Sequence, residues 1–204
     1  MAHDMPIEEL IPDKYYGRIL TGNYSEKLKK KVADTIQRLH MLDELDIQVI
    51  IYLAAWNKEE KTIWYEFVSR RFTKLMGCKP PEISGAFRNS IIESREYSYK
   101  DDYINIEKKV FDKQELSGSR KKLRLETRKK GNTEAFYKLL FEKGRAVWLK
   151  DQASIESFQQ DRIYLSLGCM TILTKEMEAA EEKERVAERL ESLLNETGRR
   201  LFRK

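Results

Sequence analysis

Residues 131–182 read GNTEAFYKLLFEKGRAVWLKDQASIESFQQDRIYLSLGCMTILTKEMEAAEE, and this stretch decides the fold. Within it, the segment 135–141 carries apolar side chains at every second position. Side chains alternate between the two faces along a strand, so this spacing predicts a half-buried β-strand. A turn containing Gly144 follows at 142–145.

Two more strands and a helix complete the stretch. The second strand is predicted at 146–158, and the polar residues 159–161 turn the chain again. Residues 163–168 then alternate as a third strand. From Thr174 the apolar period changes from two to about 3.6, which indicates a helix. Three antiparallel strands therefore lead directly into a helix.

Upstream, the sequence predicts a hairpin followed by a short helix. Residues 47–55 are apolar on both faces, as in a central strand, and residues 62–68 alternate after a polar turn. A short helix at 71–76 is stopped by Gly77. Two further segments have the spacing of helices, residues 83–92 and 103–116.

The order of these features resembles a PAS sensor domain. In this sequence the order is an aromatic strand, a Lys-Gly turn, a Trp-containing strand, an Asp-x-Ile turn, a strand with Gly and Thr, and then KEMEAAEE. The resemblance covers about residues 46–182. It implies an α+β fold with a five-stranded antiparallel sheet, curved around a central cavity and flanked by helices. We expect three parts: an N-terminal lead and amphipathic helix (1–45), a PAS-like sensor domain (46–173) and a signalling, coiled-coil helix (174–204).

An amphipathic helix is predicted ahead of the sheet, from Ser25 to about Glu44. Ser25 suits an N-cap, and apolar residues recur at steps of three and four, among them Leu28, Val32 and Leu39. This helix either covers the outer face of the sheet, pairs with a second subunit, or does both.

The C-terminal segment predicts a charged helix from 176 to about 197 with one apolar seam. The three-four spacing of this seam suits a parallel coiled coil and hence a homodimer. The alternative is a solvated helix that packs once on its own domain. The candidate dimerisation residues are Leu28, Val32, Leu39, Val186, Leu190 and Leu193.

The junction between the last strand and the helix departs from the family. Many PAS domains carry an aspartate there, and this sequence has Ile172. The resemblance implies signal transfer through this junction. The candidate relay residues are therefore Ile172, Leu173 and Thr174, acting by packing.

Few residues here could support catalysis, a metal site or a membrane span. The two histidines, His3 and His40, lie outside the predicted sheet, and the two cysteines have no metal-ligand spacing. The longest apolar run, 49–56, is far shorter than the ~20 residues of a membrane span. The N-terminus lacks a signal-peptide pattern. We expect a cytoplasmic, non-enzymatic chain without a metal.

The resemblance also bears on cofactors. Histidine-ligated heme needs an axial histidine before the final strands, and none lies between Met41 and Lys204. Covalent flavin needs a cysteine in an Asn-Cys-Arg-like motif, whereas Cys78 is followed by a lysine and two prolines. We predict neither heme nor covalent flavin, and leave open an unidentified small-molecule ligand.

Aromatic residues are concentrated on the predicted strands. In a sheet curved around a cavity they would line an apolar small-molecule pocket. The alternative is that their rings simply fill the core. The candidate ligand-binding residues are Tyr65, Phe67, Tyr137, Phe141 and Trp148.

The net charge of +5 comes from one local patch between residues 120 and 130. Such a patch can neutralise the phosphates of nucleic acid or an anionic membrane surface. It lacks interleaved aromatic residues for base stacking, so a solvated segment is favoured over nucleic-acid binding. The patch consists of Arg120, Lys121, Lys122, Arg124, Arg128, Lys129 and Lys130.

These features favour a regulatory sensor domain of a bacterial signalling protein, such as a two-component system. A small molecule or a partner would act on the sheet, and the C-terminal coiled coil would carry the signal to a downstream kinase or cyclase output domain. The rival function is a nucleic-acid-binding regulatory module that uses residues 120–130.

Overall fold

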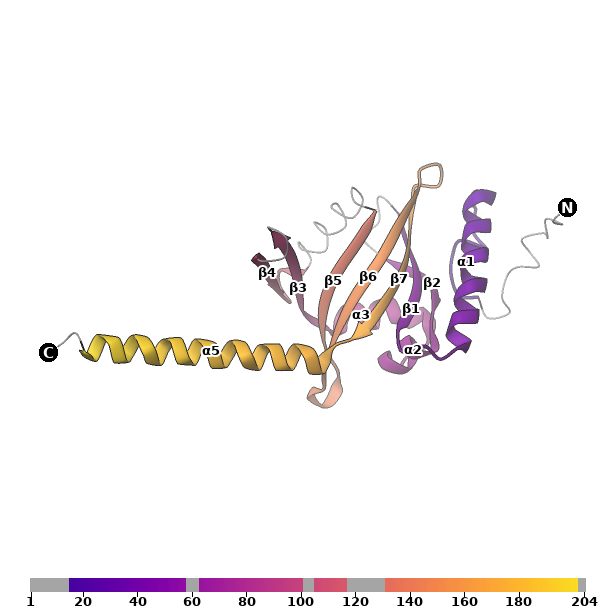
Figure 1. Ribbon diagram of the computed structural model, residues 1–204. Helices are drawn as coiled ribbons and strands as arrows, with labels where there is room; N and C mark the ends of the chain where they lie inside the picture. Colours follow the sequence, from indigo (N-terminus) through magenta and orange to yellow (C-terminus); the bar gives the residue numbers. More distant parts are fainter. Residues whose placement is uncertain (1–14, 58–62, 101–104, 117–130, 202–204) are drawn as a thin grey trace. The chain divides into compact units, whose positions relative to one another are not determined.

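The computed structural model describes residues 15–57, 63–100, 105–116 and 131–201 (Figure 1). The chain divides into two compact units, Met1–Ile172 and Leu173–Lys204. The first contains the sheet and the shorter helices. The second consists of one long helix, α5, Thr174–Leu201.

The first unit is built on one antiparallel sheet with the strand order β2-β1-β7-β6-β5-β3-β4. The predicted α+β class, an antiparallel sheet with flanking helices, is confirmed, but the sheet has seven strands and not five. The strands are β1 (Ile50–Asn57), β2 (Trp64–Val68), β3 (Ile91–Lys100), β4 (Asn105–Asp112), β5 (Asn132–Leu140), β6 (Ala146–Phe158) and β7 (Ile163–Ile172).

The two additional strands correct the interpretation of residues 83–116. The predicted helix at 83–92 ends early: α3 spans Ile83–Ser90, and β3 begins at Ile91. The helix predicted at 103–116 is wrong, because β4 occupies most of that range and pairs with β3. Its apolar residues fit either period over so short a segment, and pairing with a neighbouring strand decides between them.

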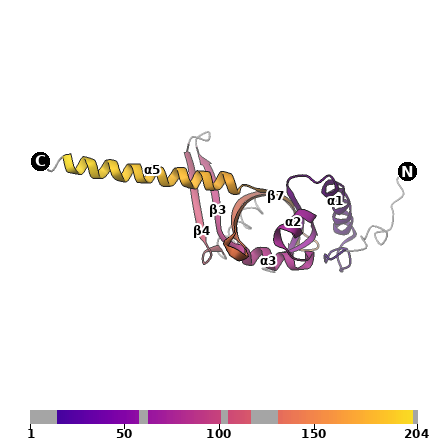
Figure 2. The same cartoon turned by 90° about the horizontal axis from the view of Figure 1, so that it is seen from below.

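Helices cover both faces of the sheet. Alternate residues of β1 belong to different clusters, because successive side chains point to opposite faces. Leu53 joins the helix α1 (Glu26–Glu44) on one face, and Tyr52 joins α2 (Arg70–Met76) and α3 on the other. Figure 2 shows α2 and α3 on the concave side of the curved sheet and α1 apart from them. We call these the α1 face and the α2–α3 face.

The helix α1 covers the sheet of its own chain. Ser25 caps it through its hydroxyl, which accepts from the Leu28 amide and donates to Asp161. Leu28, Val32 and Leu39 are buried in the cluster on the α1 face. Of the alternatives for this helix, the structure shows covering of the sheet.

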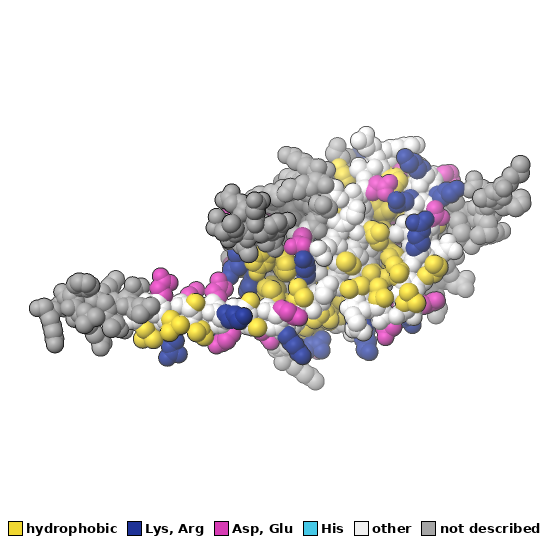
Figure 3. Space-filling view, in the orientation of Figure 1, with side chains coloured by type: hydrophobic (Ala, Val, Ile, Leu, Met, Phe, Trp, Pro, Cys, Tyr) yellow, Lys and Arg dark blue, Asp and Glu magenta, His cyan; other side chains and the backbone are white. Residues whose placement is uncertain are grey.

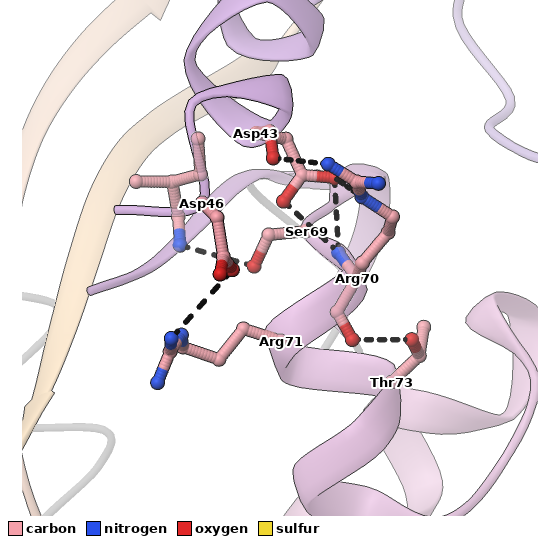
Figure 4. A network of polar contacts seen from close by, with 7 residues as sticks. Asp43, Asp46, Ser69, Arg70, Arg71 and Thr73 are labelled. Carbon is pink, nitrogen blue, oxygen red and sulfur yellow. Dashed lines mark hydrogen bonds and ion pairs between the residues drawn. The ribbon is translucent and has the colours of Figure 1, made fainter. Parts of the chain in front are cut away.

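A polar network joins the end of α1 to the start of α2 (Figure 4). The Asp43 carboxylate accepts from the Arg70 amide and its guanidinium at 3.1–3.2 Å. Arg71 lies 3.7 Å from Asp46, and the Ser69 hydroxyl accepts from the Ile51 amide. Two helices on different faces are thereby linked near β1 and β2, the pair of strands at one end of the sheet.

Candidate functional site

The candidate site is a polar cluster within the apolar α2–α3 face. Asp151 of β6 lies half-buried there, and the Tyr52 hydroxyl of β1 donates to its Oδ1 at 2.8 Å. β7 lies between β1 and β6, so this bond spans three neighbouring strands. A carboxylate among apolar side chains is unusual, because burial disfavours its charge.

Gly168 of β7 makes the contact between these two residues geometrically feasible. It lies in register with Tyr52, and a Cβ built on it would come within 2.3 Å of the tyrosine ring and hydroxyl. The ring therefore lies directly across the glycine backbone. Any larger residue at position 168 would push the tyrosine away from Asp151.

A chain of aromatic rings continues from Tyr52 across the α2–α3 face. Each ring meets the next edge to face, with centroids 5.5–5.8 Å apart, which is a favourable geometry for aromatic pairs. The rings in order are Tyr52, Tyr65, Phe72, Phe87 and Tyr137. They join side chains from β1, β2, α2, α3 and β5 in one aromatic cluster, which begins at Tyr52, the hydrogen-bond partner of Asp151.

The electrostatics of the cluster are governed mainly by burial, and among the described residues no ion pair compensates Asp151. Desolvation raises the pKa of Asp151 from 3.8 to about 7, and the hydrogen bond from Tyr52 opposes this increase. Burial first, and then the charge of Asp151, raise the pKa values of Tyr52 and Tyr65 above their ordinary range. Both tyrosines therefore keep their hydroxyl protons near neutral pH, where Tyr52 donates to Asp151 and Asp151 can change its charge.

The five predicted ligand-binding aromatics do not share one face. Tyr65, Tyr137 and Phe141 pack with the α2–α3 cluster. Phe67 belongs to the cluster on the α1 face. Trp148 is buried on the opposite side of β6 from Leu149, beneath the guanidinium of Arg95 at 4.3 Å.

Sequence reasoning missed Asp151, Tyr52 and Gly168, which connect the aromatic residues. Asp151 stands at an alternating inward position of the strand 146–158, between Leu149 and Ala153. That position of an acidic residue on an apolar face was the signal that could have revealed it.

The candidate relay residues lie where the sheet ends and α5 begins. Ile172 is the last residue of β7 and pairs in register with Leu149 of β6, and Thr174 is the first residue of α5. Asp151 pairs with Met170, two residues before that end. The candidate site is thus one strand away from the strand that continues into α5.

The candidate dimerisation residues fall into two environments. Those of α1 are buried in their own chain. In α5, the side chains of Val186, Leu190 and Leu193 are 49%, 56% and 51% exposed. Figure 3 shows hydrophobic side chains along this helix, interspersed with charged ones. The basic patch, residues 120–130, lies outside the described residues.

A second carboxylate, Glu66 of β2, is fully buried near the α1 face and has several donors. It accepts hydrogen bonds from the Tyr15 hydroxyl, the Arg18 and Ile19 amides and the Trp64 indole. Glu66 is the extra residue of a β-bulge, since Leu53 pairs with Phe67 and Ala54 with Tyr65. It anchors residues 15–20, which we call the N-terminal strap.

The described residues offer neither a metal site nor a membrane-spanning helix. No three side chains among His, Cys, Asp and Glu gather there in a metal-binding group. Within the same residues, none of the helices combines the length and apolar content needed to cross a bilayer.

Comparison with known proteins gave structural similarities only. No family model and no curated protein matches the chain. A PAS domain from Colwellia psychrerythraea is 12% identical with a TM-score of 0.45, over 70% of this chain and 98% of that one. A sensory box histidine kinase/response regulator from Burkholderia thailandensis is 13% identical with a TM-score of 0.44, over 75% and 98%. An RNA-binding light-oxygen-voltage receptor is 16% identical with a TM-score of 0.48, over 78% and 39%.

Proposed function

We propose that this chain is a regulatory sensor domain that binds a small molecule on the α2–α3 face of its sheet and passes the signal to α5. The observation that carries the proposal is the half-buried Asp151, which lies near Tyr52 and Tyr65 on a mainly apolar face. Apolar surfaces with a few converging polar groups are typical of small-molecule sites.

The proposed signal has a short route from Asp151 to α5, and its last part follows the backbone of β7. Asp151 of β6 and Met170 of β7 lie in register; β7 ends two residues later, at Ile172, and α5 begins at Thr174. A ligand that moves Asp151 or Tyr52 would strain β7 through Gly168, because the tyrosine ring lies across that backbone. Such a ligand shifts α5 from one arrangement to another only if it binds the two arrangements of the protein with different affinity.

The output end of the proposed sensor is the apolar seam of α5. Val186, Leu190 and Leu193 are exposed at the three-four spacing of a coiled-coil seam. In this proposal the seam pairs with that of a second copy, and the pairing or register of the two helices controls a kinase or cyclase output domain.

The test measures ligand binding and the response of α5 in the same protein. Native mass spectrometry identifies small molecules that copurify, and thermal shift across a metabolite panel identifies those that bind. Hydrogen–deuterium exchange then follows amides 174–193 with and without each ligand. We expect a bound ligand to raise the melting temperature and to change exchange in α5. No copurified ligand and no response to the panel would overturn the proposal.

Two matched variants test whether the response to the ligand depends on Asp151. Asp151→Asn removes the buried charge with little change of shape, and we expect it to abolish or strongly weaken the ligand response. Glu134→Gln makes the same chemical change at a carboxylate that bonds Gln152 and Lys150 near the surface. We expect Glu134→Gln to respond like the wild type. If both variants respond equally to the ligand, Asp151 does not take part in ligand binding.

A further inference from the structure

We infer that the ligand of the Asp151 site is a small organic cation, a protonated or quaternary amine, held by the Asp151 carboxylate and the surrounding tyrosine rings. This inference rests on the proposed function, since it names the class of ligand for that same site. It follows from charge, hydrogen bonding and aromatic geometry.

The first argument compares two carboxylates of the sheet, Glu66 and Asp151. Glu66 receives a hydroxyl, two backbone amides and an indole, so its charge is well compensated within the protein. Among the described residues, Asp151 receives one hydrogen bond, from Tyr52 to Oδ1, and forms no ion pair. A carboxylate held in an apolar environment with so little compensation favours the approach of a cation.

The second argument concerns the surroundings of that carboxylate. The rings of Tyr52, Tyr65 and Tyr137 belong to the aromatic chain of the α2–α3 face, and both Tyr65 and Tyr137 lie close enough to share in the electrostatics of Tyr52. Aromatic faces attract ammonium groups through their quadrupoles, most strongly where water is partly excluded. A carboxylate beside several tyrosines therefore favours alkylammonium ligands.

Access and selectivity agree with this class of ligand. Asp151 and Tyr65 keep partial solvent exposure, whereas Leu149 and Phe72 beside them are fully buried. In this proposal a small molecule approaches the carboxylate from the exposed side of Asp151 and Tyr65. An anion would meet the negative charge of Asp151, and a neutral ligand would gain neither the ion pair nor the cation–π attraction.

The test uses pairs of probes that differ in charge and match in shape. Calorimetric titration of the full chain, above the pKa of Asp151, compares choline with 3,3-dimethylbutanol and benzylamine with benzyl alcohol. We expect at least one cation to bind about tenfold or more tightly than its neutral partner, the scale of one desolvated charge contact. Equal binding of cation and neutral partner, or no binding of either cation, would overturn the inference.

Variants assign the charge selectivity to one residue. We expect Asp151→Asn to lose the preference for the cation, and Glu134→Gln to keep it. Circular dichroism establishes that both variants are folded. If Asp151→Asn still prefers the cation, the inference is wrong.

The outcomes for the ligand class and for the proposed function are distinct. If a neutral or anionic metabolite binds and changes exchange in α5 while amines do not bind, the sensor remains and the inference fails. If amines bind through Asp151 and α5 does not respond, the inference holds and the proposed relay fails. If no compound of any charge binds, both fail.

Discussion

At the scale of single residues, two carboxylates of the sheet, Glu66 and Asp151, have opposite environments. Glu66 sits on a bulge and is surrounded by donors from the N-terminal strap. Asp151 faces tyrosines and apolar side chains, and its pKa is raised to about 7 by burial. A satisfied buried charge stabilises one arrangement of the chain, whereas a poorly compensated one is free to respond to a ligand or a proton.

The raised pKa of Asp151 predicts a definite pH dependence of stability. Below 3.8 the carboxyl is protonated in both folded and unfolded chains, and it adds no penalty. As pH rises from 3.8 to about 7, the unfolded chain ionises first, so the free energy of unfolding falls. Above that range the penalty is complete. Urea denaturation at a series of pH values measures this curve.

Asp151→Asn should remove that part of the pH dependence. We expect the variant to be more stable than the wild type above neutral pH by about 2 kcal/mol, allowing for the partial exposure of the carboxyl. Near pH 4 the two proteins should have similar stability, because the aspartate is then largely protonated in the folded chain. A difference that stays constant across this range would contradict the raised pKa.

Gly168 gives a second prediction at the residue scale. A methyl group there would collide with the Tyr52 ring, so Gly168→Ala should lower the free energy of unfolding by about 1–3 kcal/mol. In a Tyr52→Ala background the same change should cost much less, because the ring is gone. A double-mutant cycle by urea denaturation measures the coupling. Additive effects would show that the close approach is unimportant.

At the scale of elements, the N-terminal strap is bound to β2 mainly through Glu66. The Tyr15 hydroxyl both donates to this carboxylate and accepts from the Leu20 amide at 3.1 Å. Tyr16 reaches the same strand, where its hydroxyl accepts from the Val68 amide at 2.6 Å. Ile19 and Leu20 of the strap are buried with α1. The strap thus covers β2, the last strand at this end of the sheet.

Glu66→Gln tests how the strap is held. The amide would place a donor against the backbone donors of Arg18 and Ile19, so we expect a loss of about 1–3 kcal/mol in unfolding free energy. Hydrogen exchange of the Arg18 and Ile19 amides should accelerate. Tyr15→Phe, which removes one hydroxyl and leaves the carboxylate, should have a smaller effect on both measurements. Protection unchanged in Glu66→Gln would exclude this role.

For β4 the local sequence pattern predicted a helix, whereas the structure shows a strand. Residues 105–112 include Ile106, Val110 and Phe111, whose spacing fits a helix as well as a strand. In the structure Val110 pairs with Arg95 of β3, and Ile106 pairs with Tyr99. Strand preference depends on the neighbouring strand, which the sequence of one segment does not specify.

At the scale of the whole molecule, the exposed seam of α5 predicts self-association. Leu190→Ala removes a central apolar side chain of this seam, so we expect the chain to associate more weakly by about tenfold or more in dissociation constant. Glu188→Ala makes the same truncation outside the seam and should leave association unchanged. Sedimentation equilibrium measures both variants. Wild-type protein that stays monomeric at high concentration would contradict the pairing of α5.

The sequence by itself determined the elements whose spacing of apolar residues, or whose capping residue, identifies them locally. The alternation in β5, β6 and β7, the Ser25 cap of α1 and the change of period at Thr174 all appear in the structure where they were predicted. These features depend on neighbours within a few positions along the chain, so one segment contains the information.

Only the tertiary structure decided which side chains meet. Tyr52 and Asp151 are 99 positions apart, and Tyr15 and Glu66 are 51 apart. Their contacts depend on strand order, on the register of β1 with β7 and of β7 with β6, and on a bulge in β2. A shift of one residue in any of these pairings would send the side chains to the opposite face, and no local pattern fixes that register.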